Sequence, residues 1–190
     1  IVDFDNYKIM IDGGKTESDA SLLHLNMIGN FNKLFILSHW HSDHYAYLTY
    51  KNHNIKTILG RGCNGQISID SNDIVIETGI DLFWDIIKIY SSRLLKLDEN
   101  SNSMVTVILY GNINYFSFGD ATREAINNYP DEIFYLIWNS HNPIIKLPHH
   151  GSKDDCYALL EKIYNKGNIR YIISGLGGDY VFNTVNAVLG

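Results

Sequence analysis

A six-residue segment of this chain carries three imidazoles and one carboxylate within a single short turn. The segment is His39-Trp40-His41-Ser42-Asp43-His44, and only Ser38 separates it from the apolar run 34–37. Imidazole nitrogens and carboxylate oxygens are the ligands that borderline divalent metals such as zinc prefer. Because the segment follows a buried strand instead of lying in a polar linker, we interpret it as a metal site and not as an accidental histidine tract.

The spacing within this segment predicts two metal ions a few ångströms apart. His39 and His41 alternate, so we expect them to point to one side and to hold the first ion. Asp43 and His44 are expected to hold the second ion, and Asp43 also to orient the attacking hydroxide. Two such ions favour hydrolysis, because a bridging water loses its proton near neutral pH while the ions polarise the bond under attack.

Further residues with metal-binding side chains follow other predicted strands. They are Asp12, Asp120 and the pair His149-His150. Side chains at the carboxyl ends of several strands converge at one rim of a layered α/β structure, so we expect all of them to share one site. Asp12 is expected to hydrogen-bond a metal-binding histidine and fix its tautomer.

Asp120 has two interpretations. It could cap the helix that Thr122 opens, or it could bridge two ions, since each carboxylate oxygen can take one cation. With the histidine segment upstream, we favour the bridge.

The adjacent histidines are expected to act differently, because neighbouring side chains in extended backbone point opposite ways. We interpret His150 as the ligand of the second ion and His149 as a contact to the substrate, although the reverse assignment stays open. Gly151 and Ser152 follow at a predicted helix start, where their N–H groups could help to hold an anion.

Alternating strand and helix patterns predict one mixed α/β domain. The expected strands are 7–11, 33–38, 56–59, 74–78, 104–110, 113–118, 144–147 and 171–174, and 82–89 is ambiguous between strand and helix. The expected helices run from a cap at Ser18 to a stop at Gly29, then over 45–50, 122–129 and 154–165. Gly111-Asn112 joins 104–110 to 113–118 as a hairpin turn.

The bulk composition excludes several classes of protein. The chain has 190 residues, of which 45% are hydrophobic, and it contains no apolar run that could span a membrane and no secretory signal. It begins inside a strand pattern without methionine, so we expect it to be truncated at its N-terminus or part of a longer protein. Two cysteines, Cys63 and Cys156, argue against a disulfide scaffold and are compatible with a reducing, cytoplasmic location.

The charge pattern also limits the kind of substrate. The formal net charge is −6, and the lysines and arginines are scattered along the sequence. A protein that grips long duplexes normally has a basic face, so this composition counts against duplex binding. It does not count against phosphoester chemistry.

These motifs together resemble the metallo-β-lactamase superfamily. The signature is the His39–His44 segment, preceded by Ile11-Asp12-Gly13-Gly14 and followed by Phe118-Gly119-Asp120. Within the superfamily, Asn100-Ser101-Asn102-Ser103 and Lys146-Leu147-Pro148-His149-His150-Gly151-Ser152 are similar to the metallohydrolase domain of bacterial competence (DNA-uptake) channel proteins.

The resemblance implies a four-layer αββα sandwich of α/β (α+β) class with a dinuclear site at one edge. It implies two divalent cations, zinc or alternatively manganese, and hydrolysis of phosphoesters. Two departures matter: Asn102 stands where the superfamily often has a histidine, and 180–183 lacks an expected late histidine. We place Asn102 and Ser152, with Asp12, around the metal ligands.

Our leading hypothesis is therefore a two-metal phosphodiesterase or nuclease that acts on phosphoesters, including single-stranded nucleic acid, together with a partner domain or protein. The first alternative keeps the metals but makes the chain an esterase, thioesterase or lactonase. An apolar pocket around Trp40, Tyr45 and Tyr47 would favour it. The second alternative is a degenerate, metal-stabilised interaction domain without activity.

Overall fold

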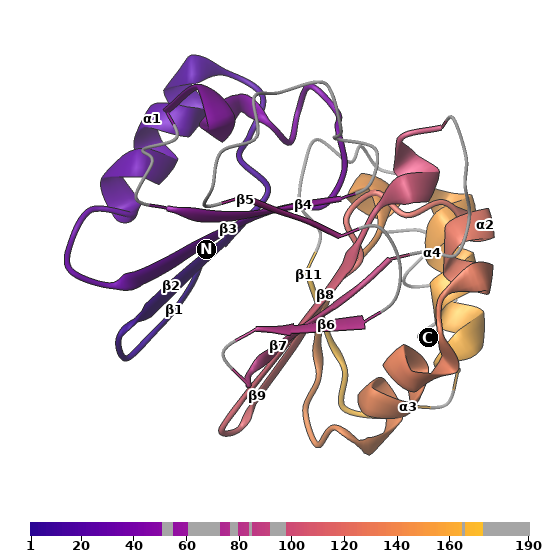
Figure 1. The fold of residues 1–190 in the computed structure, drawn as a ribbon. Helices are drawn as coiled ribbons and strands as arrows, with labels where there is room; N and C mark the ends of the chain where they lie inside the picture. Colours follow the sequence, from indigo (N-terminus) through magenta and orange to yellow (C-terminus); the bar gives the residue numbers. More distant parts are fainter. Residues whose placement is uncertain are drawn as a thin grey trace. The chain divides into compact units, whose positions relative to one another are not determined.

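The computed structural model describes residues 1–50, 55–60, 73–76, 80–83, 85–91, 98–164 and 166–172. The chain divides into two compact units, Ile1–Glu77 and Thr78–Gly190. Each unit consists of one β-sheet with helices (Figure 1). None of the helices in the described ranges is both long and apolar enough to cross a bilayer.

The first unit is built on a five-stranded sheet with the order β1-β2-β3-β4-β5. Strand β1 is antiparallel to β2, and the remaining neighbours are parallel. Helix α1 and the 3-10 helix η1 contact each other, and a core that includes Met27, Phe35 and Tyr47 packs beneath them. The elements are β1 (Val2–Phe4), β2 (Tyr7–Ile11), α1 (Glu17–Asn26), β3 (Asn32–Leu37), η1 (Ala46–Tyr50), β4 (Lys56–Gly60) and β5 (Asp73–Ile76).

The start of α1 differs from the sequence prediction. The N-cap is Thr16, whose side chain accepts a hydrogen bond from the Asp19 N–H at 3.2 Å, while the Asp19 carboxylate accepts from the Thr16 N–H at 3.0 Å. This reciprocal capping box outcompetes Ser18, which lies inside the first turn. The helix expected over 45–50 is the short 3-10 helix η1.

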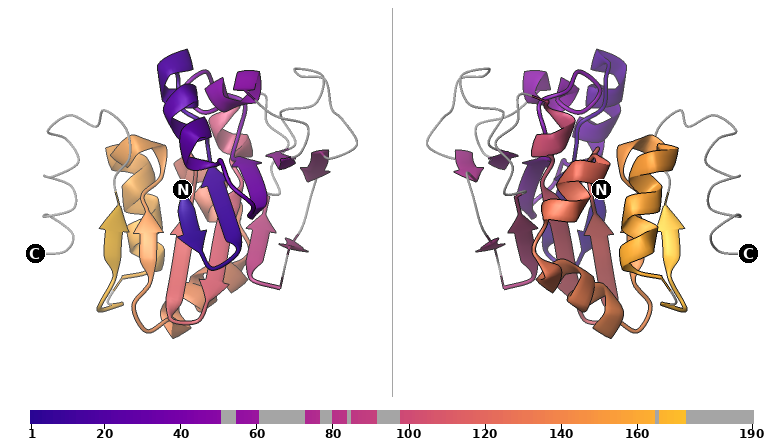
Figure 2. Two further views of the ribbon diagram at one scale, coloured as in Figure 1. Left: turned by 90° about the vertical axis from the view of Figure 1, so that its left-hand side faces the viewer. Right: turned by 90° about the vertical axis from the view of Figure 1, so that its right-hand side faces the viewer.

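The second unit has a six-stranded sheet with the order β11-β10-β9-β8-β7-β6. Strands β6 to β9 are antiparallel, and β9, β10 and β11 are parallel. Helices α2, α3 and α4 cover one face of this sheet (Figure 2), and a large apolar core lies between them and the sheet. The strands are β6 (Ile80–Phe83), β7 (Ile87–Tyr90), β8 (Val105–Tyr110), β9 (Ile113–Ser117), β10 (Ile144–Lys146) and β11 (Arg170–Ile172), and the helices are η3 (Asn100–Asn102), α2 (Arg123–Asn128), α3 (Asp131–Asn139), η4 (His149–Gly151) and α4 (Lys153–Lys162).

Most strand predictions are confirmed to within two residues, including the β8–β9 hairpin, in which Gly111 has φ = 55°. The ambiguous stretch 82–89 is neither one helix nor one strand, because Asp85 adopts φ = 57° and turns the chain between β6 and β7. Helix α3 was missed. Its signals were Pro130 before two acidic residues, followed by buried apolar side chains at Ile133 and Ile137, one helical turn apart.

Parallel pairing brings the chemically important segments together within each unit. In the first unit Ile11 of β2 pairs with Ile36 of β3, so the residues after both strands emerge at the same edge. In the second unit Ser117 of β9 pairs with Lys146 of β10, with the same result. The convergence expected at strand ends is therefore observed inside each sheet.

Gly13 generates the first prediction, because its Cα lies against η1. Its N–H donates to the His44 carbonyl, its carbonyl accepts from the Tyr47 N–H at 3.1 Å, and an added Cβ would lie 2.3 Å from the Tyr47 Cβ. We expect Gly13→Ala to lower the free energy of unfolding by about 1–3 kcal/mol in a urea titration. Gly167→Ala is the matched control, since nothing lies within 4 Å of a Cβ there. Equal midpoints for the two variants would contradict this close approach.

Candidate metal centre

The carboxylate of Asp12 organises the turn that carries the histidine segment. Asp12 follows β2 with φ = 59° and accepts hydrogen bonds from the Ser38 N–H at 2.8 Å and the Ser38 hydroxyl at 3.0 Å. The Nδ1 atom of His44 lies 2.9 Å from its Oδ2. The Ser38 hydroxyl is also 3.0 Å from Nδ1 of His39. One carboxylate and one hydroxyl thus fix the orientation of two buried imidazoles.

This orientation suits metal binding through the second ring nitrogen. When Nδ1 of a histidine faces a carboxylate or hydroxyl, Nε2 is the nitrogen that binds the metal. The Nε2 atom of His44 lies 3.7 Å from Oδ2 of Asp43. Two ligands of one tetrahedral zinc ion, each about 2.0 Å from it, are about 3.3 Å apart. The separation of these two donors therefore fits a shared divalent cation.

The other residues of the segment give the turn its shape. The His44 N–H donates to the His41 carbonyl at 3.0 Å, and the His41 N–H donates to the His39 carbonyl at 3.2 Å. The rings of Trp40 and Tyr45 stack with their centroids 4.5 Å apart. His39 is buried and His41 is exposed, with 5.3 Å between their ring centroids. The turn therefore holds one imidazole against the protein interior and presents the next to solvent.

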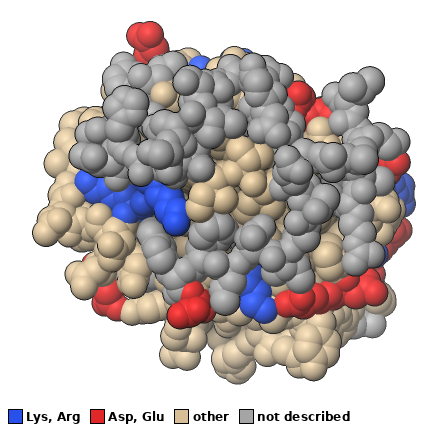
Figure 3. Space-filling model, viewed as in Figure 1, with Lys and Arg blue, Asp and Glu red and all other residues tan. Residues whose placement is uncertain are grey.

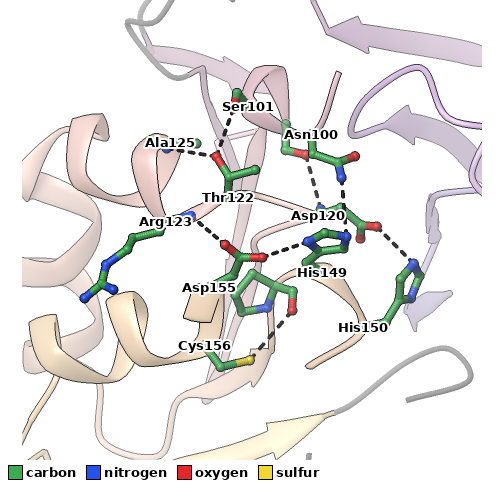
Figure 4. Close-up of polar contacts among 12 residues, drawn as sticks. Asn100, Ser101, Asp120, Thr122, Arg123, Ala125, His149, His150, Asp155 and Cys156 are labelled. Carbon is green, nitrogen blue, oxygen red and sulfur yellow. Dashed lines mark hydrogen bonds and ion pairs between the residues drawn. The ribbon is translucent and has the colours of Figure 1, made fainter. Parts of the chain in front are cut away.

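In the second unit, Asp120 follows the β8–β9 hairpin, and Figure 4 shows its contact with His150. Asp120 is buried, and its N–H donates to the Ser103 hydroxyl at 3.2 Å. Its Oδ2 lies 2.9 Å from Nε2 of His150, and its Oδ1 lies 3.6 Å from Nζ of Lys146. The following helix is capped by Thr122, so the alternative role of Asp120 as that cap is wrong.

The two adjacent histidines diverge, but not for the expected reason. Extended backbone was predicted, whereas His149 and His150 have φ = 46° and 51°, both in the left-handed region, and Gly151 follows with φ = 87°. From this turn His149 reaches Asp155, with 2.7 Å between Nδ1 and Oδ2, and His150 reaches Asp120. Non-glycine residues with such φ values cost free energy and persist only where their surroundings hold them.

The expectation that Gly151 and Ser152 would offer N–H groups to an anion is wrong. The Gly151 N–H donates to the Pro148 carbonyl at 2.9 Å, and the Ser152 N–H donates to the His149 carbonyl at 2.8 Å. The left-handed turn uses these donors internally. The hydroxyl of Ser152 instead hydrogen-bonds to Asp155.

Asp155 is a site residue that the sequence interpretation missed. It is 8% exposed and accepts hydrogen bonds from the Arg123 N–H and from His149 Nδ1, both at 2.7 Å. Burial acts to raise the pKa of Asp155, but the hydrogen bonds from His149 and its neighbours outweigh burial and lower it. The hydrogen bond to Asp155 in turn raises the pKa of His149. In the sequence, Asp155 looks like an ordinary acidic residue of a first helical turn.

In the segment before β8, Asn100 contacts one of the two adjacent histidines. The side-chain amide nitrogen of Asn100 lies 3.4 Å from Nε2 of His149, and Asn102 lies partly buried at the end of η3. Among the remaining candidates, Cys156 is buried, and burial raises the pKa of its thiol to about 12. Cys63 and 180–183 lie outside the described residues.

The Asp155–His149 contact generates a prediction. In Asp155→Asn the side chain keeps its shape, but one acceptor is replaced by an NH₂ group that faces a donor. We expect the free energy of unfolding to fall by about 1–3 kcal/mol, and the His149 ring signals in a nitrogen NMR spectrum to shift. The control is Asp154→Asn on the same helical turn, where the side chain is exposed and the change should stay within about 0.5 kcal/mol. Asp155→Asn matching its control in stability and spectrum would contradict the contact.

Comparison with known proteins bears on the fold. No protein-family model and no curated protein matches this chain. Among solved structures, the DIM-1 metallo-β-lactamase matches with a TM-score of 0.51 and 11% identity, over 98% of this chain and 83% of that chain. TMB-1, whose description refers to substrate and inhibitor binding, matches with a TM-score of 0.50 and 12% identity, over 98% and 82%. With its two sheets and their helices, the chain has the metallo-β-lactamase fold that its motifs predicted.

Proposed function

We propose that this chain is a hydrolase that uses two divalent cations, zinc or manganese, to cleave phosphodiesters. The observation that carries the proposal is the Asp12–His44–Asp43 arrangement, in which a carboxylate fixes one imidazole while a second carboxylate oxygen lies 3.7 Å from its other nitrogen. A purely structural ion pair would need one carboxylate beside the imidazole, and not a carboxylate at each of its two nitrogens. The metallo-β-lactamase fold is consistent with it.

The proposed ligands follow from the chemistry of the donors. His39 and His41 are assigned to the first ion, and Asp43 and His44 to the second. Asp120 and His150, which lie together in the second unit, are assigned as metal ligands as well. The competence-like branch, which the Lys146–Ser152 motif resembles, supports a phosphoester as the substrate.

The protein's own groups would divide the work of hydrolysis. A bound divalent cation supplies Lewis acidity and lowers the pKa of a water molecule. Asp43 orients the attacking oxygen. His149, held at Nδ1 by Asp155, presents Nε2 beside the Asn100 amide. When His149 is protonated, its Nε2–H and the Asn100 amide N–H can both donate to the oxygens of a phosphoryl group.

The surface charge favours small or single-stranded substrates over long duplexes. Figure 3 shows Lys and Arg in small groups, interspersed with Asp and Glu, on the described part of this face. With a net charge of −6, the chain is overall acidic. Tight duplex binding uses a continuous basic surface, so a nuclease role of this chain involves a partner domain or protein that supplies that grip.

One observation favours the esterase, thioesterase or lactonase alternative. The stacked rings of Trp40 and Tyr45 are only half-buried, and they place apolar surface next to His41. Tyr47, the third aromatic residue that such a pocket would use, is fully buried against Phe35. Two of the three rings therefore remain for an apolar surface, and phosphoesters remain our first choice.

The test is hydrolysis of bis-p-nitrophenyl phosphate and of single-stranded DNA with added zinc or manganese, alongside p-nitrophenyl acetate. We expect His41→Ala to lower phosphodiester turnover by about 100-fold or more, because the first ion would lose one of its proposed ligands. His141→Ala is the matched control, since His141 is an exposed histidine that is not among the proposed ligands. Metal analysis is expected to give two ions per chain in the unaltered protein and fewer in His41→Ala.

Each contrary outcome has a distinct meaning. Turnover unchanged by His41→Ala would assign the activity to a contaminant. Cleavage of the acetate ester without cleavage of phosphodiesters would favour the esterase alternative. Well under two ions per chain, together with no turnover of any substrate, would identify a degenerate interaction domain.

A further inference from the structure

Lys146 places a fixed positive charge beside a proposed metal ligand. It is the last residue of β10 and is only 7% exposed. Its ammonium donates to the Gly119 carbonyl at 2.9 Å and lies 3.6 Å from Oδ1 of Asp120. Lysine is almost never this buried unless it is paired. The pairing partner here is the carboxylate that sequence analysis assigned to the bridge between two ions.

The position of the ammonium does not depend on Asp120 alone. The Gly119 carbonyl accepts from Lys146 Nζ and also from the His149 N–H, at 3.1 Å. These two bonds fasten the turn between Gly119 and Asp120 to β10 and to the chain that follows it. Lys146 is therefore held by a neutral backbone acceptor, and its charge stays in place when the charge on Asp120 is compensated by another cation.

The two oxygens of Asp120 have different surroundings. Oδ2 lies 2.9 Å from Nε2 of His150, whereas Oδ1 faces the ammonium of Lys146. Since a buried carboxylate is costly without a compensating charge, the ammonium stabilises the metal-free form of the site. In the metal-bound form the same ammonium repels a divalent cation close by.

We propose that Lys146 is a built-in counter-cation of Asp120, which keeps the turn folded without metal and weakens the binding of metal. This inference rests on the proposed function, because it needs Asp120 to be a metal ligand. It makes Lys146 a positioning residue, acting through Asp120. The two effects are linked. An ammonium that stabilises the metal-free form more than the metal-bound form lowers the affinity of the site for the metal ion.

The test replaces the charge and measures zinc affinity and thermal unfolding on the whole chain. In Lys146→Met we expect the unfolding temperature in chelator to fall, zinc to raise it by more than in the unaltered protein, and zinc affinity to rise by about 10-fold or more. Lys146→Arg should keep both properties near those of the unaltered protein. Lys153→Met, at an exposed position of α4, is the control and should change neither.

A structural role without the charge effect gives the opposite pattern. If Lys146→Met lowers the unfolding temperature equally with and without zinc, and zinc affinity stays equal or falls, the inference is overturned. Should Lys146→Met fail to fold, Lys146→Gln keeps a donor for the Gly119 carbonyl without the charge, and its zinc affinity decides in the same way. Failure of the proposed function is recognised separately, because the unaltered protein would then bind no zinc.

Discussion

The carboxylate of Asp12 is the constraint on which the first unit's site depends. It accepts hydrogen bonds from the N–H and the hydroxyl of Ser38, just after the neighbouring parallel strand, and it lies against His44, the last residue of the histidine segment. One side chain thus ties β2, β3 and the histidine segment together. Trp40 and Tyr45 pack the turn against the apolar core, and a half-buried carboxylate that must keep its hydrogen bonds fixes the orientation of His44.

The second unit repeats the principle with different residues. Asp155 contacts Nδ1 of His149. In the first unit, Asp12 contacts Nδ1 of His44 in the same way. Asp155 also accepts from the N–H of Arg123 at the start of α2. Its orientation is therefore fixed by the packing of two helices. The chemistry proposed for the site therefore relies on carboxylates that hold the imidazoles in a fixed orientation.

Sequence reasoning succeeded where local pattern and topology agree. The apolar run before His39 predicted β3, and parallel pairing then placed Asp12 beside the segment that follows β3. It failed where tertiary contacts determine the backbone conformation or the role of a side chain. The left-handed backbone of His149 has no local sequence signature, and Asp155 cannot be told from any acidic residue that begins a helix. The superfamily and its branch, the metal and the substrate depend on side chains beyond the motifs, so they stay predictions.

The run of left-handed backbone at His149, His150 and Gly151 also limits how this segment can evolve. Few side chains other than glycine tolerate such dihedral angles, and histidine, asparagine and aspartate are the best represented among them. Branched residues such as valine or isoleucine are penalised before any question of chemistry arises. Asparagine or aspartate would therefore be the replacements that these two positions accept most readily, since the turn would keep its shape while losing its imidazoles.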